Sequence, residues 1–143
     1  MFSDCTSLIT APALPATTLA AGCYSGMFSG CSSIIVPPAL PATSLADSCY
    51  ARMFENCVSL TTAPQLLATD LPYNCYSSMF AGCILLVSTP SLLFTTVDTF
   101  SCTNMFYGCT ALVNIPTILL PVVAAPHCYA GMFQNCTSLT TTP

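Results

Sequence analysis

Residues 27–52 read MFSGCSSIIVPPALPATSLADSCYAR, and this stretch returns with small changes along the whole chain. The dipeptide Met-Phe recurs at positions 1, 27, 53, 79, 105 and 132, so the spacing is 26 residues four times and 27 once. A fixed period of about 20 to 50 residues is the sequence signature of a repeat protein whose units stack. We therefore expect a single uncapped solenoid over residues 1–143, with about 5.5 units.

Several residue types return once in every unit. Stacking the units would bring each type into a continuous row, and such rows build a core that no single unit could build alone. The aromatic row consists of Phe2, Phe28, Phe54, Phe80, Phe106 and Phe133, the thiol row of Cys5, Cys31, Cys57, Cys83, Cys109 and Cys136, and the proline row of Pro12, Pro38, Pro64, Pro90, Pro116 and Pro143. We expect the aromatic and thiol rows, with an aliphatic row that begins at Leu8 and Ile34, to form the core.

Two local patterns predict the elements of a unit. Cys23, Met27 and Cys31 are spaced i, i+4, i+8, which would place them on one face of an α-helix over residues 22–31. The residues from Ile34 to Leu45 include β-branched and proline residues, which are typical of short extended strands. The predicted fold class is an α/β repeat solenoid, leucine-rich-repeat-like, with one short strand and one short helix in each 26-residue unit.

The order Met-Phe-x-x-Cys-x-Ser-Leu, then Pro, two Leu and Cys-Tyr before the next Met-Phe, resembles the BspA-like class of bacterial surface leucine-rich repeats. The resemblance covers the whole chain. It implies an extracellular solenoid on a bacterial cell surface, with a role in adhesion or protein binding. Met-Phe in place of the family's Ala-Phe, a longer period and few charges are departures that leave the partner open.

The composition excludes several classes of protein. Only 4% of the residues are charged, 54% are hydrophobic and the formal net charge is -4. Disordered chains combine low hydrophobicity with high charge, and nucleic-acid binding needs more cations than the single Arg52. No apolar run approaches the roughly 20 residues of a membrane-spanning helix. The polar residues after Met1 do not resemble a signal peptide, so we expect any export signal to be absent from this chain.

The chain has eleven cysteines, an odd number, so at least one has no partner within the chain. On the expected helix, Cys23 and Cys31 would lie about 12 Å apart, too far for a disulfide. Disulfides between neighbouring units stay open, for example along Cys5, Cys31 and Cys57. The interpretation we favour is that the thiols are free and pack as small buried side chains. No Cys-x-x-Cys spacing occurs, so we expect no metal and no cofactor.

The sequence contains no catalytic constellation. His127 is the only histidine, and the five carboxylates are scattered singly over the units, so no acid-base pair or activated nucleophile is indicated. We therefore expect no enzyme, but a non-catalytic scaffold for adhesion or recognition of a protein or glycan. Two alternatives stay open: self-assembly into stacked dimers or filaments through uncapped ends, and an ice-binding face rich in threonine.

Two sets of residues are candidate binding sites. The first is a row of hydroxyl side chains formed by Thr17, Thr43, Thr69 and Thr95. The second lies in the unit that starts at residue 79, where Leu85 and Phe94 replace small or polar residues of other units. These apolar residues predict an exposed patch; the alternative is that the unit has drifted and its core has repacked.

Overall fold

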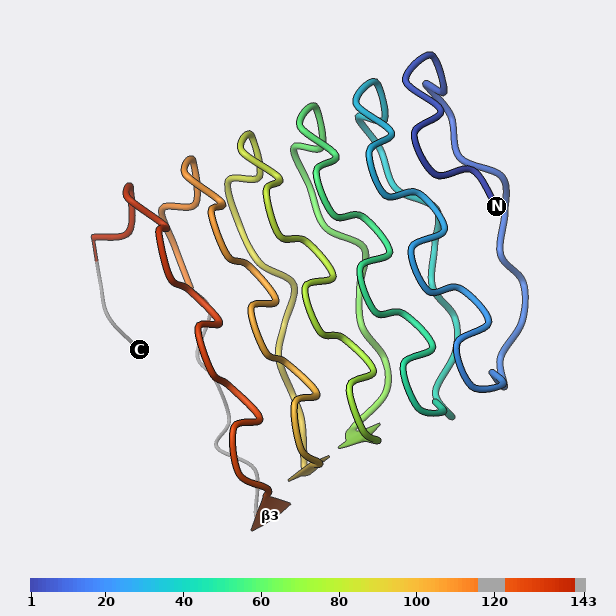
Figure 1. Ribbon diagram of the computed structural model, residues 1–143, viewed down its shortest axis with the longest axis vertical. Coiled ribbons are helices and arrows are strands. Elements are labelled where there is room, and N and C mark those ends of the chain that lie inside the picture. The colour runs from blue at the N-terminus through green and yellow to red at the C-terminus, as the bar shows by residue number, and fades with distance from the viewer. Residues whose placement is uncertain (116–122, 141–143) are drawn as a thin grey trace.

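The computed structural model describes residues 1–115 and 123–140. Over these residues the chain winds as a stack of similar coils that follow one another in sequence order (Figure 1). The parallel register places a residue beside the one that follows it by 26 positions, as at Asp70 and Thr96. The offset is 26 at Ser88 and Asn114 but 27 at Thr96 and Val123, so the extra residue of the fifth unit lies between Asn114 and Val123.

The predicted α/β fold class, with a helix and a strand in every unit, is wrong. The described residues contain no helix and only three strands, which are β1 (Asp70–Leu71), β2 (Thr96–Val97) and β3 (Val123–Ala124). These strands form one parallel sheet in the order β1-β2-β3. Isolated parallel bridges also join Thr10 to Val36, Thr18 to Ser44 and Ser88 to Asn114. The molecule is therefore a coil stack built mostly from turns.

A ribbon of consecutive turns at residues 20–31 replaces the helix predicted over residues 22–31. Every second N–H, from Cys23 to Cys31, donates to the carbonyl three residues earlier. The intervening N–H groups donate to the next coil, as Tyr24 does to the carbonyl of Cys49 at 3.0 Å. Every backbone donor from residue 22 to residue 31 is thus satisfied, as a buried backbone requires. This turn ribbon recurs at residues 46–57, 72–83, 98–109 and 125–136.

Positive φ angles explain why the ribbon is not a helix. In the first copy they occur at every fourth residue, with values of 65°, 60° and 72° at Gly22, Gly26 and Gly30. A right-handed helix needs negative φ throughout, and all six glycines of the chain have positive φ. Because the turn pattern also repeats every four residues, it places Cys23 and Met27 on the same side, as a helix would. The spacing alone therefore predicted the wrong element.

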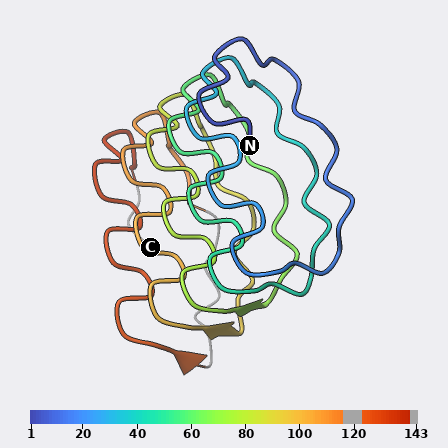
Figure 2. The same ribbon diagram turned by 45° about the vertical axis from the view of Figure 1, so that its right-hand side comes forward.

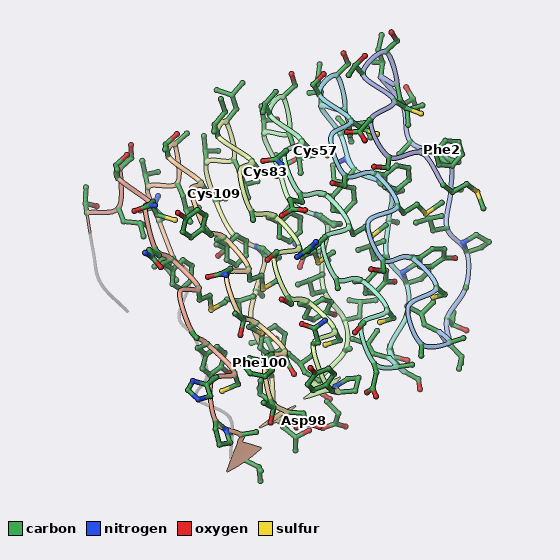
Figure 3. All side chains as sticks on the ribbon, viewed as in Figure 1. Phe2, Cys57, Cys83, Asp98, Phe100 and Cys109 are labelled. Atoms are coloured by element: carbon green, nitrogen blue, oxygen red, sulfur yellow. The ribbon has the colours of Figure 1, made fainter. Side chains whose placement is uncertain are left out.

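Stacked phenyl rings form one row of the core. Successive ring centroids from Phe2 to Phe133 lie 5.4 to 5.8 Å apart, within the range in which aromatic pairs attract each other. The thiol row lies beside these rings. Cys57 Sγ donates to the carbonyl of Phe28 in the preceding coil at 3.1 Å. Cys31, Cys83, Cys109 and Cys136 make the equivalent bond, and Figure 3 shows Cys57, Cys83 and Cys109 in line across the stack.

All eleven cysteines are free thiols, and nine of them are buried. The interpretation of free, buried thiols is therefore confirmed for these nine, whereas Cys5 and Cys23 are exposed. The disulfides between units that the sequence left open are not formed.

A second aromatic row shows how the fourth unit has drifted. Tyr24, Tyr50 and Tyr76 stack with centroids 5.9 and 6.0 Å apart, but the residue aligned with Tyr76 in the next coil is Cys102. Phe94 supplies the missing ring instead, 6.0 Å from Tyr76. Phe94 is only 2% exposed, so the expected exposed patch is wrong for this residue and the core has repacked around it.

The other side of the first four coils is an extended leg, at residues 9–19, 35–45, 61–71 and 87–97. Figure 2 shows these legs and the turn ribbons as the two walls of the stack. Proline returns in the legs at Pro12, Pro38 and Pro64, and proline has no N–H to donate.

Within the described ranges, no helix has the length and apolar character that crossing a membrane requires.

Candidate functional site

The strands β1, β2 and β3 run side by side at one end of the coils (Figure 1). Residues of these strands line an open groove. Its volume is about 670 Å³, and four consecutive coils line it. The lining residues are Thr43, Ser44 and Leu45 from one coil, Asp70, Leu71 and Pro72 from the next, then Thr96, Val97 and Asp98, and finally Val123 and Ala125. We call this the polar groove. Side chains alternate between the two faces along β1 and β2, so Asp70 and Thr96 point outward, whereas Leu71 and Val97 point into the core.

Two carboxylates give the polar groove its charge. Asp70 Oδ1 accepts hydrogen bonds from Thr96 Oγ1 at 2.7 Å and from Thr95 Oγ1 at 3.0 Å. These two hydroxyls, Thr96 first, lower the pKa of Asp70, because a hydrogen bond to the ionised form favours that form. Asp98 Oδ1 accepts the N–H of Thr99 at 2.6 Å. None of the lining residues that the structure describes carries a positive charge, so the groove is anionic.

Three exposed rings stand beside the polar groove. Tyr73 and Phe100 meet edge to face with centroids 6.1 Å apart, and His127 stacks on Phe100 at 5.8 Å. We call Tyr73, Phe100 and His127 the aromatic corner. Figure 3 places Phe100 and Asp98 at the same end of the coils, far from Phe2. Tyr73 is 45% and Phe100 38% exposed, so both rings are open to solvent.

Phe100 has an unfavourable backbone conformation, with a φ of 60°. Positive φ is rare for bulky residues and costs on the order of 1–3 kcal/mol. The aligned residues of the earlier coils are Gly22, Ser48 and Asn74, which are small or short polar residues. The ring of Phe100 is therefore not required by the turn that holds it.

The structure places the residues predicted from sequence at several different positions. Thr17, Thr43, Thr69 and Thr95 are all exposed, but only Thr43 lines the polar groove. Of the other hydroxyl and carboxylate side chains that line it, Ser44, Asp70 and Thr96 belong to the neighbouring column, and Asp98 lies two positions further along its coil. Leu85 is 50% exposed and lies outside the groove lining, whereas Phe94 is buried.

Sequence reasoning missed the aromatic corner. The sequence does contain a signal for it, because ring side chains stand at positions that small residues fill in the first coils. Phe100 and His127 are aligned with Gly22 and Ser48, and Tyr73 is aligned with Ala21. These substitutions are not periodic, and only the stacking register brings the three rings together.

The buried thiols are held in an inert form. Burial raises the pKa of Cys49 to about 11 and that of Cys57 to about 12, so both thiols are protonated at neutral pH and are poor nucleophiles and metal ligands. Across residues 1–115 and 123–140, no three His, Cys, Asp or Glu side chains gather where they could hold a metal ion. The arrangement is suited to binding through surface groups.

Comparisons of the chain with protein-family models, with curated proteins and with solved structures found no match. The resemblance to BspA-like surface proteins therefore stays a prediction. The polar groove and the aromatic corner are the features of the molecule that bear on its function.

Proposed function

We propose that this chain is a non-catalytic binding module that recognises an extracellular protein or glycan through its polar groove. The observation that carries the proposal is the groove itself, which four coils line with hydroxyl, carboxylate and aliphatic groups. Binding sites are typically concave and mainly apolar, with a few convergent polar groups that fix the orientation of the partner. A repeat scaffold holds such a surface rigid, because each coil is bonded to the next.

Binding is better supported than catalysis by the state of the reactive groups. The thiols of Cys49 and Cys57 are buried and protonated, and the imidazole of His127 stacks on Phe100. A general base needs a proton to abstract within hydrogen-bond reach and a partner that orients it. The residues of the groove instead supply hydrogen-bond donors and acceptors.

The proposed location is the bacterial cell surface or another extracellular site, as the resemblance implies. Free thiols are usually associated with reducing compartments. Nine of the eleven thiols are buried here, and buried, protonated thiols are slow to oxidise. Their burial is compatible with an oxidising environment.

The two alternative functions have less support. An ice-binding face would need equivalent hydroxyls along the stack, but Thr95 and Thr96 donate to Asp70, which interrupts the row. Self-assembly through the ends of the stack stays a prediction. Light scattering of the 143-residue chain checks it, and a monomer at every concentration would contradict it.

Probing peptide and glycan arrays with the labelled chain tests the proposed function. We expect at least one class of immobilised peptide or glycan to be retained. The double variant Ser44→Ala/Thr96→Val, which removes two hydroxyls from the groove, should weaken that binding by about tenfold or more. Thr10→Val is the matched control, because Thr10 is exposed outside the groove and its aligned neighbour is already Val36. Absence of binding on both arrays, or binding that the groove variant leaves intact, would refute the proposal.

A further inference from the structure

The few charges of the chain are unevenly distributed. Three of the five carboxylates lie at the groove end of the coils: Asp70 and Asp98 line the groove, and Asp47 is aligned with Tyr73 of the aromatic corner. Arg52, the one arginine or lysine of the chain, lies on a turn ribbon, and its carbonyl accepts the N–H of Glu55. The groove end therefore carries a net negative charge, which attracts cations.

The aromatic corner adds a second feature that favours cations. The face of an aromatic ring carries partial negative charge and attracts an ammonium or guanidinium group within about 6 Å of its centroid. Tyr73 and Phe100 offer exposed rings beside the carboxylates, whereas Phe28, Phe54, Phe80 and Phe106 are fully buried. A carboxylate next to an exposed ring supplies both the charge and the surface on which a planar guanidinium stacks.

The turn that holds Phe100 does not require its ring. Positive φ at this position belongs to the turn ribbon, because Gly22, Ser48, Asn74 and His127, the aligned residues of the other coils, share it. The earlier coils fill the position with small or short polar residues, which adopt positive φ more readily than a phenyl group does.

We infer that the polar groove and the aromatic corner together bind a cationic side chain, an arginine or lysine, of a protein partner. The inference rests on the proposed function and specifies its partner as a protein with a basic segment. Arginine fits better than lysine, because a planar guanidinium can stack on exposed ring surface and pair with a carboxylate at once. His127 already stacks on Phe100, so that surface is the part of Tyr73 and Phe100 that stays exposed. A neutral glycan can donate hydrogen bonds to the two carboxylates but carries no positive charge to pair with them, and an anionic glycan would be repelled.

Calorimetric titration tests the inference. Four ligands are added to the chain at low and at high salt: hexa-arginine, hexa-lysine, hexa-glutamate and maltohexaose. We expect hexa-arginine to bind most tightly and hexa-lysine more weakly. We expect hexa-glutamate and maltohexaose not to bind. Binding of hexa-arginine should weaken as salt rises, because salt screens exposed charges.

Four single variants assign the binding to this site. Asp98→Asn and Phe100→Asn should each weaken hexa-arginine binding by about tenfold. Asn is compatible with positive φ and occupies the aligned position at Asn74, so Phe100→Asn should keep the fold and raise or preserve the melting temperature. Glu55→Gln and Tyr107→Ala are the matched controls: both residues lie outside the groove and the corner, and Ala81 already occupies the position aligned with Tyr107. Each control should change binding by less than about twofold.

The outcomes separate this inference from the proposed function. No binding of hexa-arginine, or equal losses in Asp98→Asn and Glu55→Gln, would overturn the inference, because equal losses mean attraction by net charge alone. If a neutral peptide or glycan depends on Ser44 and Thr96 while hexa-arginine does not bind, the inference fails and the proposed function stands. If Phe100→Asn does not fold, Tyr73→Ala tests the same ring contact.

Discussion

Phe94 shows at the scale of single residues how one change in a repeat compensates for another. Its ring continues the tyrosine row at the point where Cys102 leaves the row without one. Ala68 and Tyr76 are the equivalent residues one unit earlier. A small residue and a large one have therefore exchanged sides of the coil while the core remains filled.

This exchange predicts the outcome of a rescue experiment. Phe94→Ala should lower the free energy of unfolding by about 3–5 kcal/mol, since it leaves a cavity beside Tyr76. Adding Cys102→Tyr should recover most of the loss, because the pair then matches Ala68 and Tyr76, whereas Cys102→Tyr alone should overpack the core. Urea denaturation of the three variants measures the effect. A double variant no more stable than Phe94→Ala would contradict the compensation.

Two glycines in the same column allow a matched comparison. Gly82 and Gly108 have φ angles of 74° and 70°, so alanine at either position should cost about 1–2 kcal/mol for the left-handed conformation. A Cβ at Gly82 would also collide with the side chain of Asn56, whereas at Gly108 the nearest atom is the backbone nitrogen of Gly82 at 3.9 Å. Gly82→Ala should therefore lower the midpoint of urea denaturation more than Gly108→Ala. Equal shifts would show that the Asn56 side chain does not constrain the column.

The turn ribbon and the extended leg differ at the scale of elements. Every N–H from residue 22 to residue 31 has a backbone acceptor, whereas the N–H groups of residues 37–42 and 63–68 have none in the part of the chain that the structure describes. Amide exchange reports this difference, because N–H groups without a hydrogen bond exchange without global unfolding. Hydrogen-deuterium exchange should be orders of magnitude faster in residues 63–68 than in the adjoining ribbon, 72–83. Comparable protection in the two segments would contradict the described bonding.

At the scale of elements, some features of the fold follow from the sequence and others do not. The period and the aromatic and thiol rows could be predicted, because stacked units must align equivalent residues. The helix could not be excluded by spacing, because the ribbon and a helix both place Cys23 and Met27 on one side. Glycine at every fourth position, from Gly22 to Gly30, was the available signal against a helix. The aromatic corner could not be predicted, since Phe100 meets His127 only through the register of two coils.

At the scale of the whole molecule, the buried thiols predict instability at alkaline pH. Burial raises the pKa of Cys49 to about 11 and that of Cys57 and Cys109 to about 12, while a thiol of the unfolded chain titrates near 8.5. Between these values the unfolded chain loses protons that the folded chain keeps. The free energy of unfolding is therefore highest below about pH 8.5 and decreases as the pH rises to about 12. Urea denaturation over this range should show a falling midpoint. A constant midpoint would contradict the burial of the thiols.

The polar groove depends on the whole stack, because its walls come from four coils and its shape from their register. The central claim is that alternating hydrogen bonds, within a coil and between coils, hold this register. NMR tests this hydrogen-bond pattern most directly. It measures scalar couplings between an amide nitrogen and the carbonyl carbon of its hydrogen-bond acceptor. We predict couplings from Tyr50 to Cys75 in the next coil and from Cys49 to Ala46 within the same coil. A coupling from Tyr50 to Ala46, four residues back, would reveal a helix and contradict the account.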